Sequence, residues 1–277
     1  MKITIRGVRG SIPTSGPATQ KYGGNTSCIE VSAEGWQLVL DGGSGMRNSN
    51  TQERPLNNRL DILLTHLHMD HIQGLGFFKP FFDPEMEVHI WGPAGSRKSL
   101  HARLSKYLSP PLFPMYIREL PCQLILHEVD RSEFEIGPFR VQSQYVIHPG
   151  PTVGFRINDG EKTFTYIPDH EPALGIHGIV SDQKWISGFD LASNADLLIH
   201  DAQYTTAEYK ERTGWGHSSM DDALRFASMA CVKKLLMAHH DPNHTDTYLG
   251  ELLTELKMRN NYSFHFDLAE EGMIIEL

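Results

Sequence analysis

The hexapeptide at residues 66–71 gathers side chains that bind metal ions. It holds three histidines and one aspartate, namely His66, His68, Asp70 and His71. Side chains two apart on an extended segment share a face, so His66 and His68 can bind one ion, while the turn after them directs Asp70 and His71 to a second. A single histidine is most often a structural residue, but this cluster predicts a two-metal site.

Four side chains do not complete two metal sites, so the hypothesis requires further ligands at the ends of other strands. His148, Asp169 and His239 each follow a run of apolar residues that is typical of a strand. We expect His148 to complete the first site and His239 the second. Asp169 would bridge the two ions and leave a position for a shared hydroxide. His240 directly follows His239 and is an alternative last ligand.

Strand patterns with turn residues between them place these candidates in a fold. The succession of strands and helices occurs twice, which predicts an α/β fold with two sheets packed together and covered outside by helices. No repeat or linker divides residues 1–277, so we expect a single domain. The expected strands are residues 2–6, 28–33, 36–41, 61–65, 87–91, 123–128, 139–148, 163–167, 196–200 and 234–238, and the expected helices follow His71 and cover 96–108, 204–212, 219–231 and 246–258.

The composition is that of an ordinary globular protein. Its 277 residues are 40% hydrophobic, which is enough for a large core. The formal net charge of −9 argues against nucleic acid as a partner, because Lys and Arg supply that affinity. We see neither a membrane-spanning stretch nor a signal peptide, so we expect a cytoplasmic protein. The widely spaced Cys28, Cys122 and Cys231 are expected to be buried thiols.

Residues 7–27 form a long glycine-rich loop after the first strand. Glycine allows the backbone to approach a ligand closely, so this loop is a candidate for the substrate side of the site. Its proposed substrate contacts are Arg9, Tyr22 and Asn25. Residues 175–191, by contrast, show no pattern to which we assign a role.

The chain resembles the metallo-β-lactamase superfamily, whose HxHxDH motif stands here at residues 66–71. The other motifs of that family match Asp41, His148, Asp169 and His239, in the same order along the chain. The resemblance implies an αββα sandwich with two metal ions at one edge. It also implies that Asp41 supports the site through hydrogen bonds without binding metal itself.

Two further segments are similar to the branch of that superfamily that contains ribonuclease Z and cyclic phosphodiesterases. Residues 200–202 read His-Asp-Ala, and residues 216–219 read Gly-His-Ser-Ser. In that branch an acidic residue supports a histidine that protonates the leaving oxygen, and Asp201 and His217 stand at those positions here. The resemblance therefore implies phosphodiester hydrolysis, in which a metal-bound hydroxide attacks phosphorus and His217 is the general acid. Asp70 counts as a catalytic residue as well as a ligand.

Several functions are compatible with this pattern. The leading hypothesis is a phosphodiesterase acting on a small phosphodiester substrate, a cyclic nucleotide or a phosphoribosyl cyclic phosphate. A tRNA 3′-processing endonuclease is the first alternative, although the acidic composition and the lack of a Gly/Lys-rich arm for gripping tRNA speak against it. A lactonase or thioesterase would not need the pair of Asp201 and His217. A metal-binding regulator without catalysis would not need the complete ligand set.

Imidazole and carboxylate ligands suit zinc, manganese and iron alike. The family resemblance favours two ions of zinc or manganese. A homodimer is an expectation from related enzymes alone.

Overall fold

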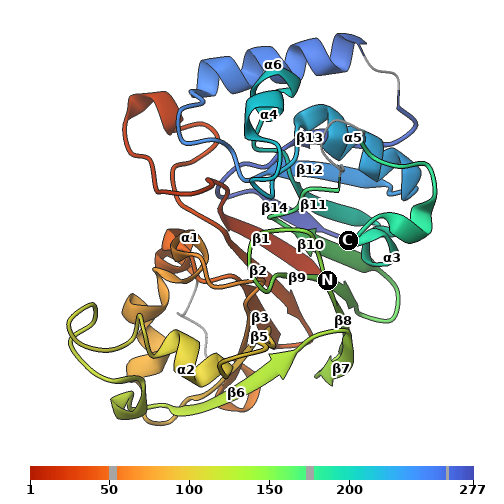
Figure 1. Ribbon diagram of the computed structural model, residues 1–277. Helices are drawn as coiled ribbons and strands as arrows, with labels where there is room; N and C mark the ends of the chain where they lie inside the picture. Colours follow the sequence, from red (N-terminus) through yellow and green to blue (C-terminus); the bar gives the residue numbers. More distant parts are fainter. Residues whose placement is uncertain (50–54, 173–177, 260–261) are drawn as a thin grey trace.

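Two seven-stranded sheets face each other, and helices cover the outer surface of each sheet (Figure 1). The computed structural model describes residues 1–49, 55–172, 178–259 and 262–277. The α/β sandwich of four layers that the sequence predicts is thereby confirmed.

The first sheet contains the strands of the amino-terminal half together with the last strand of the chain. In spatial order these strands are β14 (Ile274–Glu276), β1 (Lys2–Gly7), β2 (Cys28–Ala33), β3 (Trp36–Leu40), β4 (Arg59–Leu63), β5 (Glu87–Pro93) and β6 (Gln123–Val129). The pairs from β14 to β3 are antiparallel, whereas β3, β4, β5 and β6 run parallel. Two short helices, α1 (Met69–Ile72) and α2 (Leu100–Leu104), lie on its outer side (Figure 1).

The second sheet mirrors this arrangement. Its strands in spatial order are β13 (His265–Leu268), β12 (Lys234–Ala238), β11 (Leu197–Asp201), β10 (Thr163–Ile167), β9 (Val153–Asn158), β8 (Phe139–Tyr145) and β7 (Ser132–Ile136). Strands β10 to β13 run parallel, and the remaining pairs are antiparallel. The helices of this half are α3 (Phe189–Ala192), α4 (Thr206–Arg212), α5 (Met220–Met229) and α6 (Asp246–Arg259).

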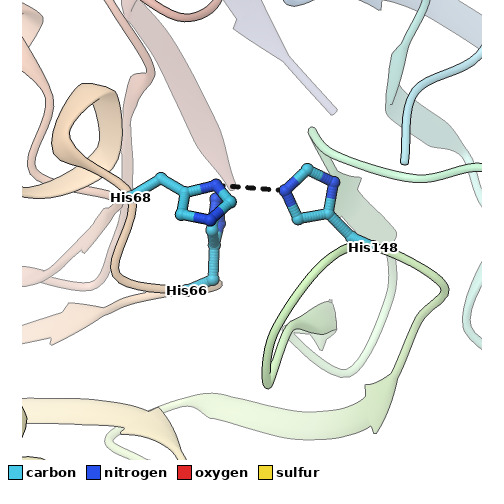
Figure 2. A group of neighbouring side chains, drawn as sticks. All are labelled: His66, His68 and His148. Atoms are coloured by element: carbon cyan, nitrogen blue, oxygen red, sulfur yellow. Dashed lines mark hydrogen bonds between the residues drawn. The ribbon is translucent and has the colours of Figure 1, made fainter. Parts of the chain in front are cut away.

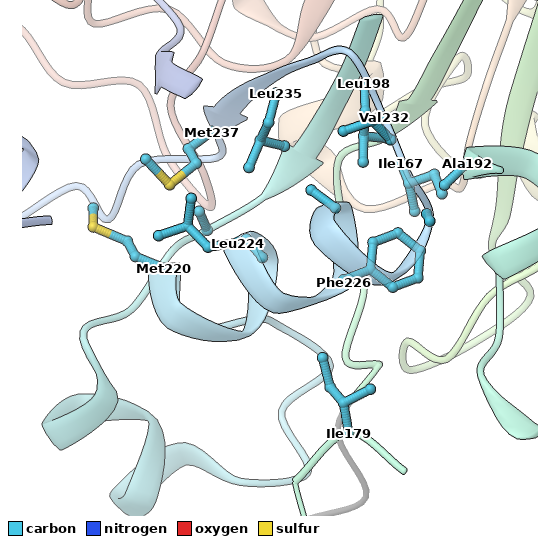
Figure 3. Packing of buried hydrophobic residues seen from close by; sticks show 14 of the residues in the cluster. Ile167, Ile179, Ala192, Leu198, Met220, Leu224, Phe226, Val232, Leu235 and Met237 are labelled. Atoms are coloured by element: carbon cyan, nitrogen blue, oxygen red, sulfur yellow. The ribbon is translucent and has the colours of Figure 1, made fainter. Parts of the chain in front are cut away.

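Three layers of buried apolar side chains hold the sandwich together: one between the sheets and one between each sheet and its helices. The helix α5 shows how such a layer forms. Ser219 caps its first turn by accepting a hydrogen bond from the Asp222 backbone, and Asp222 complements the positive end of the helix dipole. Leu224 and Phe226 then pack beneath the second sheet (Figure 3). This packing fixes the start of α5, which begins three residues after His217.

The parallel strands explain why the candidate ligands meet. The carboxyl ends of parallel strands lie at the same edge of a sheet, and ligands of α/β proteins commonly bind there. Strand β4 leads into residues 66–71, β10 leads into Asp169, β11 ends at Asp201, and β12 is followed directly by His239.

The observed elements differ from the expected ones mainly at their boundaries. Strand β4 ends before Leu64, and β8 ends at Tyr145, so His148 belongs to the loop after the strand. The helix expected at 96–108 is limited to α2. The helix expected to follow His71 begins earlier, so that His71 lies within α1. The sequence did not predict four of the strands, which are β7, β9, β13 and β14. Strands β13 and β14 are too short to show a period, and β9 depends on its pairing with β8 and β10.

Two smaller expectations also have an outcome. Cys28 and Cys122 are buried, but Cys231 is exposed, which corrects the expectation of three buried thiols. Residues 175–177 lie outside the described residues, and the rest of the unassigned stretch includes the 3-10 turn Gln183–Trp185 and the start of α3. None of the helices in the described part of the chain has the length and apolarity needed to cross a membrane.

Candidate metal centre and catalytic pair

The structure brings the seven predicted ligand side chains together in two adjoining groups. One group consists of His66, His68 and His148, and the other of Asp70, His71, Asp169 and His239. Within each group one nitrogen or oxygen atom per residue lies within 4.8 Å of those of the others. Residues far apart in the sequence thus converge at one edge of the sandwich.

The first group combines two loops, one after β4 and one after β8 (Figure 2). His148 Nε2 lies 3.2 Å from His68 Nδ1, and its other ring nitrogen, Nδ1, donates to the Gly216 carbonyl at 2.8 Å. His66 Nδ1 lies 3.1 Å from the Thr65 hydroxyl. Because these partners occupy Nδ1 of His66 and of His148, the neutral ring of each histidine presents the lone pair of Nε2 to the centre.

Asp169 lies between the two groups. Its Oδ1 is 3.0 Å from His71 Nε2, while its Oδ2 is 3.3 Å from His239 Nε2, 3.7 Å from His148 Nε2 and 3.8 Å from His66 Nε2. The carboxylate therefore faces donors of both groups, as a bridging ligand would.

The backbone after β1 closes the second group. Ser11 N–H donates to Asp70 Oδ2 at 2.7 Å, and the same oxygen lies 3.2 Å from His239 Nε2. Gly10 packs so closely on the His239 ring that a Cβ atom there would lie 2.4 Å from Nδ1. The start of the glycine-rich loop is thus part of the wall of the centre.

Asp41 supports the site from behind. Its carboxylate accepts hydrogen bonds from the Thr65 N–H at 2.8 Å, from the Thr65 hydroxyl at 2.9 Å and from His71 Nδ1 at 2.8 Å. Asp41 thus supports both His71, which it contacts directly, and His66, which contacts the Thr65 hydroxyl. Asp41 is fully buried and belongs to neither group of donors that faces the centre.

Replacing Asp41 with asparagine should weaken metal binding by about 10- to 100-fold, because an amide cannot accept from both Thr65 and His71 as the carboxylate does. Competition with a chromophoric chelator measures this affinity. Asp190→Asn, at a side chain that is 74% exposed, is the matched control. Equal affinities of D41N and the control would contradict the supporting role of Asp41.

The two neighbouring histidines after β12 point to different surroundings. His239 faces Asp70 and Asp169, whereas His240 Nε2 lies 3.0 Å from the Ala269 carbonyl and its ring packs on Tyr22. Burial lowers the pKa of His240 to about 3, so it is a neutral structural side chain. His239 is therefore the better candidate for the last ligand.

Burial and mutual charge determine the ionisation of the centre. Burial opposes a charge on His71, yet Asp169, Asp41 and Asp70 raise its pKa well above the usual range. Burial also opposes a charge on His239, and Asp169 with Asp70 raises the pKa of that ring to about 9. Burial and the neighbouring His71 lower the pKa of His66 well below its usual value. The two aspartates at the centre thus hold protons on adjacent imidazoles, and a bound cation would compete with those protons.

Unpaired atoms at the centre show that the donor set fits divalent cations. Among the described residues, His66 Nε2 is buried without a hydrogen-bond partner, and His71 Nε2 and Asp169 Oδ1 are 3.0 Å apart but form no hydrogen bond of normal geometry. Such atoms are costly in a folded protein unless something else satisfies them. Five imidazoles and two carboxylates are ligands for zinc, manganese or iron, whereas calcium and magnesium prefer oxygen.

Asp201 and His217 form a pair beside this centre. His217 Nδ1 lies 2.6 Å from Asp201 Oδ2, and its ring stacks on His239 with centroids 4.8 Å apart. Asp201 is fully buried and also accepts from the backbone N–H groups of His170, Gln203 and Ser218. Its oxygens are thus committed to protein donors, so it orients His217. Among the described residues His217 Nε2 makes no hydrogen bond, and the side chain is 12% exposed.

A pocket of about 320 Å³ opens beside the first group. His66 and His68 form part of its wall, together with the apolar Met69 and Leu112 and the cationic Lys106. A pocket that touches the candidate ligands and combines apolar surface with a positive charge is suited to an anionic organic substrate.

Two of the three proposed substrate contacts in residues 7–27 are buried. Arg9 is fully buried, and its guanidinium donates to the carbonyls of Gly23, Asp241 and His244. Tyr22 is 1% exposed and packs in the core. Both residues stabilise the loop from within, and a sequence pattern does not distinguish that role from ligand binding.

Asn25 is bound to protein partners. Its amide nitrogen donates to Glu271, and its amide oxygen accepts from the Ser44 hydroxyl.

Sequence reasoning missed the supporting residues Thr65, Ser11 and the Gly216 carbonyl. Thr65 directly precedes the hexapeptide, and Gly216 directly precedes His217, so proximity to a candidate was the signal available. Ser11 acts through its backbone, for which no side-chain pattern exists.

The chain is similar to known proteins in sequence and in fold. The family model described as "Beta-lactamase superfamily domain" matches residues 37–240. Ribonuclease Z from Haloarcula marismortui is 25% identical and aligns over 99% of this chain and 96% of its own length. Among solved structures, the short form of human tRNase Z superimposes with a TM-score of 0.69 at 22% identity, covering 100% of this chain and 99% of that one. A diphosphatase of the PhnP family gives 0.70 at 18% identity, with coverages of 100% and 97%.

The fold, the relatives and the cluster of imidazoles and carboxylates place this protein in the class of metal-dependent hydrolases. The family match extends over most of the chain, and the protein belongs to the beta-lactamase superfamily.

Proposed function

We propose that this protein hydrolyses phosphodiesters with two divalent metal ions. His66, His68 and His148 would hold one ion, Asp70, His71 and His239 the other, and Asp169 would bridge them. The ions would neutralise charge on the phosphate and make water a better nucleophile at neutral pH. The observation that carries the proposal is the pair of Asp201 and His217 beside this centre, since a carbon-ester hydrolase has no need of it.

The residues of the chain account for the proton transfers. Hydrolysis joins the oxygen of one water molecule to phosphorus and breaks one P–O ester bond. The departing oxygen would take a proton from His217 Nε2. The proton that the attacking water loses would pass by way of Asp70 to the solvent, from which His217 is protonated again. Asp201 holds the opposite nitrogen of His217, so the ring keeps Nε2 directed away from the carboxylate. Asp70 would accept a hydrogen bond from the attacking water in addition to binding an ion.

Two substrate classes remain, and different observations favour them. The relatives named ribonuclease Z and tRNase Z favour 3′-end processing of tRNA, which sequence reasoning placed second. The net charge of −9 and a pocket of about 320 Å³ favour a small phosphodiester such as a cyclic nucleotide. The relatives are similar along their whole length, so we place the RNA substrate first and the small diester second.

Direct competition between substrates tests this order. Metal-loaded protein is assayed with precursor tRNA carrying a 3′ trailer, with a linear dinucleotide, with cyclic nucleotides and with a lactone. We expect the highest kcat/KM for the precursor tRNA, and preference for a cyclic nucleotide would reverse the order of the two classes. Turnover of the lactone alone would contradict phosphodiester hydrolysis itself.

Addition of zinc, manganese or iron(II) to chelator-treated protein should raise its Tm. Binding to the folded state alone contributes about 2.7 kcal/mol at a metal concentration 100 times the Kd. Differential scanning calorimetry measures the shift, and calcium is the matched control because the donor set is mostly imidazole. A Tm that none of the three transition metals changes would argue against a metal centre.

A further inference from the structure

Glu171 is a buried carboxylate that the proposed reaction does not use. It follows Asp169 by two residues and is 4% exposed. Its Oε1 accepts from the Tyr209 hydroxyl at 2.7 Å and from Gly214 N–H at 2.8 Å, and its Oε2 accepts from Gly216 N–H at 2.8 Å. Both oxygens are occupied by protein donors, so Glu171 is neither a metal ligand nor a substrate contact.

Two of these donors, the N–H groups of Gly214 and Gly216, belong to the loop that carries His217, so Glu171 holds that loop. Gly214 and Gly216 lie between α4 and α5, with φ values of 87° and 89° that side chains other than glycine rarely adopt. The loop therefore has no strong backbone preference of its own for this shape. Two hydrogen bonds to one carboxylate fix it on both sides of Trp215, immediately before His217.

The same loop also contacts the metal centre. The Gly216 carbonyl accepts from His148 Nδ1 at 2.8 Å, while Gly216 N–H is bound to Glu171. A single peptide segment thus orients a candidate ligand and precedes the candidate proton donor. A shift of this segment would move both.

The tripeptide 169–171 connects the parts of the site. Asp169 faces both groups of ligands, His170 N–H donates to Asp201 Oδ2, and Glu171 holds the loop. The Ser218 hydroxyl donates back to the His170 carbonyl at 2.6 Å. The distance between the bridging carboxylate and the proton donor is therefore set by one short segment after β10.

We propose that Glu171 is a positioning residue that holds His217 against the metal centre in the orientation needed to protonate the leaving oxygen. The inference rests on the proposed function, because it assigns Glu171 a purpose only if His217 is the proton donor. The role depends on the negative charge of Glu171, since three donors converge on its carboxylate.

The test compares two diesters that differ in their need for a proton. Glu171→Gln keeps the shape but places an amide NH2 against an N–H or O–H donor. We expect its kcat to fall about tenfold or more for a linear dinucleotide, whose alkoxide must be protonated, and by less than about threefold for bis(p-nitrophenyl) phosphate, whose phenolate leaves readily. Tyr209→Phe removes one donor but leaves both loop bonds, and should stay within about twofold of the native enzyme on both substrates.

A double variant tests whether Glu171 acts through His217. In a His217→Ala background, E171Q should cause no further loss with the dinucleotide, because the positioned group is already gone. All variants are assayed at saturating metal and their metal content is measured, since Gly216 also holds His148. Equal losses on both diesters, or additive losses in the double variant, would overturn the inference.

A second variant covers the case in which E171Q fails to fold. Gly214→Ala strains the loop through its positive φ, while an added Cβ meets nothing within 4 Å. It should show the same selective loss with the dinucleotide, and a uniform or absent effect would contradict the inference. If the native enzyme hydrolyses neither these diesters nor precursor tRNA, the proposed function fails instead.

Discussion

Replacing Asp169 with asparagine should lower kcat for phosphodiesters by about 10³-fold or more, because the ions supply several kcal/mol of charge stabilisation and each 1.36 kcal/mol is a factor of ten. Asp169 faces donors of both groups, with His71 Nε2 3.0 Å from one of its oxygens and His66 Nε2 3.8 Å from the other. An amide carries no charge to offset two cations, so we also expect at least one ion to be lost.

Measurement of metal content and steady-state kinetics on the same preparation tests this expectation. The variant should remain folded, because His71 and His239 can give up the protons that Asp169 stabilises, so that no buried charge is left without a partner. Asp267→Asn, at a side chain that is 46% exposed, is the matched control and should behave as the native protein does. Retention of both ions with full activity in D169N would remove Asp169 from the centre.

Replacing His217 with alanine should lower kcat for a linear dinucleotide by about 10²-fold, the usual scale for a general acid. The loss should be small with bis(p-nitrophenyl) phosphate, because its leaving group needs no proton. Asp201 should stay in place, since three backbone N–H groups still hold it. The cavity left by the ring should accept imidazole, so added imidazole should restore part of the activity.

His265→Ala is the control for that experiment, since His265 is an exposed histidine on β13, away from the donors of the site. Undiminished turnover of the dinucleotide by H217A would show that His217 is not the proton donor. Hydrolysis of a carbon ester would then be the better explanation of the metal centre.

Much of the site was predictable because its residues stand where strands end. His66, Asp169 and His239 follow β4, β10 and β12, and parallel strands bring such positions to one edge. His148 was found for the same reason, although it lies three residues beyond its strand. The pairing of Asp201 with His217 came from family resemblance, and no periodicity would have revealed it.

The rest depends on tertiary contacts that leave no local pattern. Arg9 has the residue type and loop position of an anion-binding group, yet three backbone carbonyls enclose its guanidinium. Glu171 has the residue type of a surface glutamate, yet it is buried under donors from a loop more than forty residues further along the chain. Strands β13 and β14 are four and three residues long, so pairing and not propensity decides them.

Anomalous diffraction from crystals loaded with zinc or manganese tests the central claim most directly. We expect two peaks on either side of the Asp169 carboxylate, one among His66, His68 and His148 and the other among Asp70, His71 and His239. Peaks at other positions, or no peak within this cluster after loading, would contradict it.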